Sequence, residues 1–229
     1  MTLLYVLGTG SKWQDNELRY SLRSVHAHVD VHTVIFAGHR PEWLQNVVHI
    51  PCPDIYQHGV ACTLHKLLVA CGDERVPASF ILMNDDFLFL EDHPSPLPTY
   101  VRGTIQQRVT EGPRYEKFYY CMMQQALSVL RKQGIAEPLD FDGHHPMPMT
   151  KNGVLAMAAR YGGSGSVYPW RSYYGNMHPG ATVHGRDPKL YSWREPRGGF
   201  ISLGDELPRS REFVRWIEQR FPDPSPYES

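Results

Sequence analysis

The sequence lacks the features that direct a protein to a membrane or to nucleic acid. No segment approaches the roughly 20 consecutive apolar residues of a membrane-spanning helix. The 23 Lys and Arg residues are balanced by 24 Asp and Glu, a formal net charge of −1, so non-specific binding of nucleic acid by a basic surface is disfavoured. The four cysteines have no CxxC spacing and lie in apolar segments, which predicts reduced core residues rather than a disulfide or zinc framework.

An export signal is also missing. The first residues carry no basic segment ahead of the apolar run and lead directly into Gly8, Thr9 and Gly10, which is typical of a buried strand and not of a signal peptide. We therefore expect a cytoplasmic protein. With 229 residues, of which 41% are hydrophobic and 12% aromatic, the chain can bury a substantial core, and this composition excludes disorder.

The first ninety residues alternate between short apolar runs and amphipathic segments. We predict strands at residues 3–7, 31–37, 47–50 and 80–83, because short continuous apolar runs are typical of parallel strands buried on both faces. We predict one helix after a cap at Asp15 or Asn16 and another after a cap at Thr63, each with apolar residues at helical spacing. This order predicts an α/β fold with a mostly parallel sheet and helices on both faces.

The second half of the chain is less regular. We predict a proline-rich loop or lid over residues 91–116, a helix over 116–132 and a polar loop over 140–148. A short helix should follow a Thr150 cap, and a last helix should contain Phe213. Residues 161–199 have weak periodicity, which favours a substrate-binding excursion. We expect a single domain, with a nucleotide-binding half at residues 1–92 and an acceptor-side half at 93–229.

Three polar residues end the strand predicted at 80–83. Asn84, Asp85 and Asp86 follow it directly, and ligands bind at the carboxyl ends of strands in open α/β sheets. Two carboxylates beside a buried strand need a compensating charge, which Mg²⁺ or Mn²⁺ bridging a pyrophosphate would supply. An ordinary turn with solvated aspartates fits the same residues, so both interpretations stay open.

Gly8, Thr9 and Gly10 form a second candidate, between the first predicted strand and the first helix. Glycines there let backbone amides approach a nucleotide, and a hydroxyl can hydrogen-bond it. A tight strand-to-helix turn explains the same residues, because no third glycine completes a dinucleotide-binding fingerprint.

His144 and His145 lie close to two aspartates, Asp140 and Asp142. An imidazole beside carboxylates can act as a general base or bind a metal. Adjacent side chains on an extended chain point to opposite sides, so at most one of the two histidines is expected to face a shared site. A structural role is the alternative, since the chain contains 12 histidines.

Arg171 lies in an aromatic-rich segment at residues 170–178. Aromatic rings stack on sugar faces, and a guanidinium binds phosphate oxygens, so this segment suits a sugar or phosphate ligand. A packing loop is the alternative, and single-stranded nucleic acid would also suit stacked rings beside an arginine.

Several of these strings resemble one known family. Residues 16–24, then 41–44, then 80–90 match, in order and rough spacing, the second block of the Stealth family. Its members are hexose-1-phosphate transferases of bacterial capsule synthesis, related to the animal enzyme that tags lysosomal glycoproteins with GlcNAc-phosphate. Residues 144–149 resemble the third block, and Gly204 and Asp205 with residues 221–228 resemble the C-terminal block. One departure is that the family's first strand ends in Trp-Val-Asp-Gly, whereas residues 6–10 contain no aspartate.

The resemblance implies a fold like that of GT-A glycosyltransferases, with a nucleotide-sugar donor over the carboxyl edge of the sheet. Asp86 and Asp85 would then hold Mg²⁺ or Mn²⁺ on the donor pyrophosphate. The residues implied to contact the nucleotide sugar are Gly8, Thr9, Gly10, Asn16, Arg19, Asn84 and Asp85. Arg19 also suits a structural salt bridge.

The resemblance also implies roles on the acceptor side. His145, or else His144, would deprotonate the acceptor hydroxyl, and Arg171 would stabilise developing phosphate charge. Asp205 would be a further metal or acceptor ligand.

Three functions compete at this point. The leading one is transfer of sugar-1-phosphate from a nucleotide sugar to a hydroxyl, with release of nucleoside monophosphate. The second is glycosyl transfer with release of nucleoside diphosphate, and its acceptor could be a glycan or a hydroxylated DNA base. The third is a non-catalytic nucleotide- or glycan-binding module, which the missing first-strand aspartate favours and the intact Asn84, Asp85 and Asp86 oppose.

Overall fold

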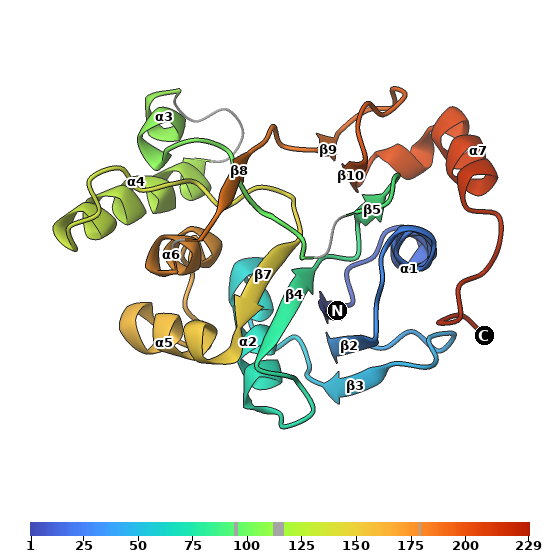
Figure 1. Ribbon diagram of the computed structural model, residues 1–229, viewed down its shortest axis with the longest axis horizontal. Coiled ribbons are helices and arrows are strands. Elements are labelled where there is room, and N and C mark those ends of the chain that lie inside the picture. The colour runs from blue at the N-terminus through green and yellow to red at the C-terminus, as the bar shows by residue number, and fades with distance from the viewer. Residues whose placement is uncertain (94–95, 112–116, 179) are drawn as a thin grey trace.

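The computed structural model describes residues 1–93, 96–111, 117–178 and 180–229, and its centre is a five-stranded sheet of order β3-β2-β1-β4-β7 (Figure 1). Strands β1 (Thr2–Leu7), β2 (Thr33–Gly38), β3 (Val48–Pro51) and β4 (Ser79–Met83) are parallel to one another. The fifth, β7 (Met147–Thr150), runs antiparallel to β4 at the edge. The four predicted strands and the mainly parallel sheet are confirmed.

Helices cover both faces of this sheet, as predicted. Alternate residues of β1 point to opposite faces, so Leu3 and Tyr5 pack with α1 (Asn16–His28), whereas Leu4 packs with α2 (Gly59–Gly72). The face covered by α2 is also packed by α4 (Lys117–Lys132), α5 (Lys151–Tyr161) and α6 (Trp170–Met177).

A smaller three-stranded sheet follows β4 without an intervening helix. Strand β5 (Phe87–Phe89) pairs antiparallel with β10 (Phe200–Leu203), which pairs parallel with β9 (Lys189–Leu190). The last helix, α7 (Arg211–Arg220), packs against this sheet through Phe213 and Ile217 after a short 3-10 turn at Leu207–Arg209. The sheet brings residues from near position 190 and position 205 to the end of β4.

The loop predicted over 91–116 contains regular structure. Strand β6 (Thr99–Val101) pairs with β8 (Thr182–His184), and α3 (Ile105–Thr110) begins with a capping box at Thr104. Residues 94–95 and 112–116 of this prediction lie outside the described residues, as does residue 116 of the predicted helix, which is described from Lys117 as α4.

Three further sequence predictions are corrected. The polar loop expected over 140–148 ends in β7, where Pro148 is tolerated because the strand lies at the sheet edge. Thr63 does not cap α2: it lies inside the helix, and the His58 side chain accepts the cap hydrogen bond from the Val60 amide. All four cysteines are free, but Cys121 is exposed, whereas the other three are buried.

The segment 161–199 also differs from its prediction, because it contains α6, β8 and β9. Six consecutive residues of α6, from Trp170 to Gly175, are buried, so the helix has no polar face to give it a visible period. Throughout the described ranges, no helix is long and apolar enough to cross a membrane.

Candidate functional site

A cleft lies at the carboxyl edge of β1 and β4. The two strands are parallel neighbours, paired at Leu3 with Ile81, so the residues that follow them emerge at the same edge. The cleft has a volume of about 370 Å³. We call residues 140–146, the loop that precedes β7, the histidine loop. The lining residues of the cleft come from the turn after β1, the start of α1, the turn after β4, the histidine loop, β9, the end of β10 and the 3-10 turn: Gly8, Gly10, Ser11, Lys12, Trp13, Glu17, Asn84, Asp85, Asp86, His144, Lys189, Leu203, Gly204, Asp205 and Pro208.

Seven of the candidate residues from the sequence share this cleft. They are Gly8, Gly10, Asn84, Asp85, Asp86, His144 and Asp205. They derive from positions almost 200 residues apart, and the smaller sheet brings their segments together. The remaining candidates, which do not line the cleft, are Thr9, Asn16, Arg19, His145 and Arg171.

The Arg19 side chain forms a structural pair away from the cleft. Its guanidinium lies 4.0 Å from the ring centre of Trp43, and its Nη1 is 3.3 Å from the Glu228 carboxylate. This matches the salt-bridge alternative. Thr9 donates its amide and its hydroxyl to Asp54, and Asn16 is the first residue of α1.

The Asp86 carboxylate is the most tightly held acid in the cleft. Its Oδ2 accepts hydrogen bonds from Lys189 Nζ at 2.5 Å and from Ser202 Oγ at 2.7 Å. Its Oδ1 is buried and has no hydrogen-bond partner among the residues that the structure describes. Burial, followed by the charges of Asp86 and Glu17, raises the pKa of Asp85 to about 7.

These observations test whether a divalent cation suits the cleft. Asp85 and Asp86 are adjacent, and a buried Asp86 oxygen lacks a partner in the described part of the chain. Burial, and after it the charge of Asp86, raises the Asp85 pKa, so the pair fits a hard cation. In the described ranges no group of three or more His, Cys, Asp and Glu residues is placed to hold a metal. The two aspartates therefore fit Mg²⁺ or Mn²⁺ as a partial set that phosphate oxygens would complete.

Two lysines, which the sequence reasoning missed, bring positive charge into the cleft. Lys12 pairs with Asp205 at 2.9 Å, and Lys189 pairs with Asp86. Lys12 is held in a tight turn, where the Ser11 hydroxyl accepts hydrogen bonds from the amides of Trp13 and Asp15. The position of Lys12, two residues after Gly10, could have indicated from the sequence that it lies near the cleft. No local pattern marks Lys189, because it reaches the cleft only through the pairing of β9 with β10.

The two adjacent histidines face different spaces, as the sequence predicts. His144 lines the cleft, and its Nδ1 lies 2.9 Å from Asp187 Oδ1. Arg102 holds the same carboxylate at 3.1 Å. Burial opposes the negative charge of Asp187, but the hydrogen bond with His144 and the positive charges of His144 and Arg102 outweigh it and hold the pKa of Asp187 well below its usual value.

His145 lines a second, larger space beside the cleft. Its ring stacks on Tyr100, with ring centres 4.4 Å apart and planes 15° apart. Burial lowers the pKa of His145 to about 4, so the ring is neutral near neutral pH. The family resemblance favours His145 as the base, but in the structure it is His144 that shares the cleft with Asp85 and Asp86.

Arg171 is buried on α6, behind the histidine loop. Its Nη2 donates to the His145 carbonyl oxygen, while its Nε is buried with no hydrogen-bond partner within the described part of the chain. Burial lowers its pKa. Arg171 thus contacts the backbone of the histidine loop from behind.

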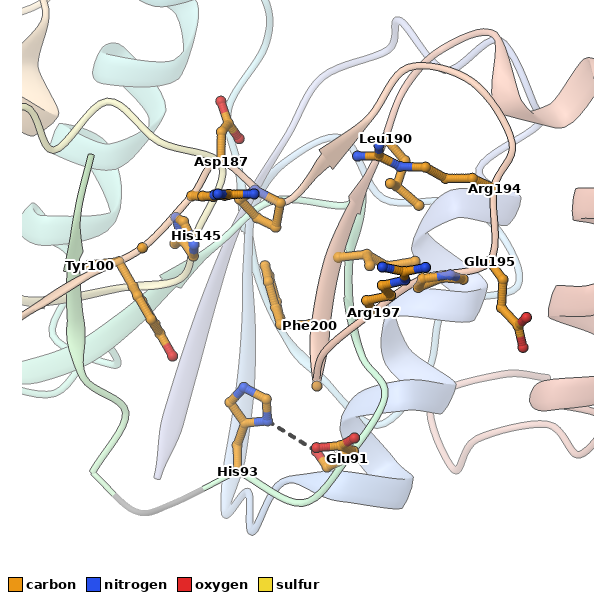
Figure 2. Close-up of a pocket in the computed structure, with 16 residues that line it drawn as sticks. Glu91, His93, Tyr100, His145, Asp187, Leu190, Arg194, Glu195, Arg197 and Phe200 are labelled. Atoms are coloured by element: carbon orange, nitrogen blue, oxygen red, sulfur yellow. Dashed lines mark hydrogen bonds between the residues drawn. The ribbon is translucent and has the colours of Figure 1, made fainter. Parts of the chain in front are cut away.

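The second space is a cavity of about 1020 Å³ (Figure 2). Aromatic side chains and the histidine loop lie on one side, and the loop between β9 and β10 lies on the other. Sixteen residues line it: Glu91, His93, Tyr100, His145, Gly185, Arg186, Asp187, Pro188, Leu190, Arg194, Glu195, Pro196, Arg197, Gly199, Phe200 and Ile201. We call it the arginine cavity.

Comparison with known proteins identifies the fold. No protein-family model matches the sequence, and no curated protein sequence matches it. Among solved structures, the galactosyltransferase LgtC in complex with donor and acceptor sugar analogues has a TM-score of 0.53 and 11% identity, over 97% of this chain and 94% of that chain. An active-site mutant of LgtC has a TM-score of 0.51 and 12% identity, over the same shares. The chain therefore has a GT-A-like fold, while the resemblance to the Stealth family stays a prediction.

Proposed function

We propose that the chain is a transferase that uses a nucleotide-sugar donor bound in the cleft. The observation that carries this proposal is the position of Asp85 and Asp86, at the carboxyl end of β4 and across from the turn that follows β1, in a GT-A-like sheet. Ligands of open α/β sheets bind at this edge.

The charges in the cleft suit a diphosphate. Lys12 and Lys189 are each paired with a carboxylate, and phosphate oxygens would compete for both ammonium groups. Gly8 and Gly10 would let the nucleotide approach the backbone, and Asn84 would hydrogen-bond it. Asp85 and Asp86 would hold Mg²⁺ or Mn²⁺, which when bound neutralises charge that develops on the leaving phosphate.

His144 is our candidate for the general base. Its side chain lies in the cleft, and Asp187 fixes one ring nitrogen, which leaves the other for the proton of an acceptor hydroxyl. Asp205, which shares the cleft, would contact the acceptor or the cation once a ligand draws Lys12 away.

Two reactions suit this arrangement. In glycosyl transfer the acceptor oxygen attacks the anomeric carbon, the bond from that carbon to the phosphate oxygen breaks, and nucleoside diphosphate leaves. The fold shared with a galactosyltransferase favours this reaction. In sugar-1-phosphate transfer the acceptor oxygen attacks the phosphorus next to the sugar, the bond from that phosphorus to the bridging oxygen of the pyrophosphate breaks, and nucleoside monophosphate leaves. The motifs that resemble the Stealth family favour this second candidate.

Calorimetric titration with UDP-, GDP-, ADP- and dTDP-linked sugars in Mn²⁺ tests the donor site. We expect the protein to bind at least one of them and Asp86→Asn to weaken that binding by at least about tenfold, or about 1.4 kcal/mol. Asp30→Asn is the matched control, because Asp30 is exposed and precedes β2 at the opposite edge of the sheet. Removal of Mn²⁺ with a chelator should also weaken binding. If no nucleotide sugar binds, or if Asp86→Asn binds as the control does, the proposal is wrong.

A further inference from the structure

The arginine cavity and the cleft lie on two sides of the same segments. In the histidine loop, His144 lines the cleft and His145 lines the cavity. Around β9, Lys189 lines the cleft, whereas Asp187 and Leu190 line the cavity. The pair formed by His144 and Asp187 therefore connects the two spaces, and a ligand in the cavity would lie beside the proposed base.

One side of the cavity is aromatic. The rings of Tyr100 and His145 are stacked, and the ring of Phe200 lies 6.0 Å from that of His145 at an angle of 17°. Figure 2 shows these three side chains together along this side. Tyr100 and Phe200 are half-buried, so each keeps surface toward the cavity. Aromatic surfaces of this kind stack on the apolar faces of sugar rings.

The facing loop supplies two cations. Arg194 and Arg197 are exposed, and neither forms a hydrogen bond or ion pair with any residue in the described ranges. In Figure 2 the Arg194 side chain extends toward Leu190, and Arg197 lies beside the strand that carries Phe200. The Glu195 carboxylate, between the two arginines in sequence, points away. Of the two other lining carboxylates, Asp187 is already paired with Arg102 and His144, and Glu91 lies beside His93 in Figure 2.

We propose that the arginine cavity is the acceptor subsite, and that its ligand is an anionic saccharide. The sugar ring would pack on Tyr100 and Phe200, and a carboxylate or phosphate group on the sugar would bind Arg194 and Arg197. This inference rests on the proposed function of the cleft. Guanidinium groups bind both kinds of anion through paired hydrogen bonds, whereas a neutral sugar would leave both arginines unpaired.

Nucleic acid fits these observations less well. A strand of DNA needs a row of cations along its backbone, but Arg194 and Arg197 lie together at one cavity. The chain as a whole has a net charge of −1. The cavity volume of about 1020 Å³ suits a few sugar residues rather than a duplex.

The test uses saccharide probes without any donor. The probes are a glucuronic-acid-containing oligosaccharide, a phosphorylated oligosaccharide, a neutral oligosaccharide of equal length and a thymidine oligonucleotide. Their binding to the full chain is measured by calorimetry. We expect at least one acidic saccharide to bind at least about tenfold more tightly than the neutral one. The double variant Arg194→Gln/Arg197→Gln should remove this preference.

The control is Arg211→Gln/Arg215→Gln, which removes the same charge from exposed positions on α7, outside the cavity. It should bind all probes as the parent does. Four results would each overturn the proposal. The first two are equal binding of neutral and acidic saccharides, and no binding of either acidic probe. The others are tighter binding of the oligonucleotide, and an unchanged preference for acidic saccharides in the Arg194→Gln/Arg197→Gln variant. If no nucleotide sugar binds in the donor titration but the acidic saccharides bind as expected, the proposed transferase function is wrong and the cavity is a saccharide site.

Discussion

At the scale of single residues, the cleft is organised by charge pairs between distant parts of the chain. Lys189 holds Asp86, Lys12 holds Asp205, and Arg102 and His144 hold Asp187. These three carboxylates are therefore compensated before any ligand arrives, which lowers the cost of placing them close together. The phosphate groups of a ligand would therefore compete with these carboxylates for Lys12 and Lys189.

The choice of base can be tested by comparing the two adjacent histidines. We expect His144→Ala to lower kcat by about 10²–10⁴-fold while donor affinity changes little, because the base acts only when the acceptor hydroxyl loses its proton. His145→Ala should change mainly the KM for the acceptor, because its ring stacks on Tyr100 at the cavity. Steady-state kinetics with the identified donor separate the two. A kcat effect confined to His145→Ala would contradict the assignment.

Glu228 gives a second residue-level prediction, for stability. Its side chain accepts hydrogen bonds from Arg23, Arg19 and Ser225. Glu228→Gln should lower the free energy of unfolding by about 1–3 kcal/mol, because two arginines lose their counter-charge while keeping some contact with water. Arg209→Ala, at the exposed pair with Glu206, should cost less than about 1 kcal/mol. Urea denaturation measures both.

The pH dependence of the Glu228 effect has a definite sign. Burial opposes its charge, but hydrogen bonds from Arg23 and Ser225 and the charge of Arg23 hold the pKa of Glu228 below its usual value. A depressed pKa stabilises the folded state above the pKa of the unfolded chain, and this contribution is lost as the pH falls through the folded value. The difference between parent and Glu228→Gln should therefore shrink from about pH 7 to about pH 3; a difference that grows would contradict the pairing.

At the scale of elements, α6 is fixed by close packing against the loop before β7. A Cβ atom added to Gly175 would lie 2.4 Å from ring atoms of Phe141. Gly175→Ala should therefore destabilise the fold by about 1–3 kcal/mol, since the ring cannot move without disturbing the core. Gly72→Ala at the end of α2 meets no atom within 4 Å and should be neutral or stabilising by up to about 1 kcal/mol. Thermal denaturation of both variants checks this, and an equal effect of the two would contradict the close packing.

The elements that could be predicted from the sequence are those with strong local patterns. Strands β1 to β4 are continuous apolar runs, and α1 and α7 have clear apolar stripes, so each is recognisable without its neighbours. Strand β7 contains Pro148, and α6 is buried all round, so neither has a pattern that its own residues reveal. Both depend on tertiary contacts.

The same reason explains which parts of the site were foreseen. Gly8, Gly10, Asn84, Asp85 and Asp86 follow parallel strands, and chain topology alone predicts that they meet. Lys189 and Asp187 could not be placed, because the pairing of β9 with β10 has no local signature. The opposite orientation of His144 and His145 was predictable, whereas the side that each would face was not.

At the scale of the whole molecule, the fold is shared with LgtC over 97% of this chain at a TM-score of 0.53. The cleft takes residues from both ends of the chain, since Gly8 and Asp86 meet Lys189 and Asp205. The division into a nucleotide-binding half at 1–92 and an acceptor-side half at 93–229 stays a prediction, but the cleft depends on both halves. A truncated first half should therefore not bind the donor.

The most direct test of the central claim is to identify the nucleotide released from nucleotide sugars in the presence of Mn²⁺ and saccharide acceptors. We predict that one donor is consumed, that nucleoside diphosphate is released for glycosyl transfer, and that Asp86→Asn abolishes the release. Nucleoside monophosphate would show that the second candidate, sugar-1-phosphate transfer, is the reaction. Donor binding without any released nucleotide, across neutral and acidic acceptors, would contradict the account and leave a non-catalytic binding module.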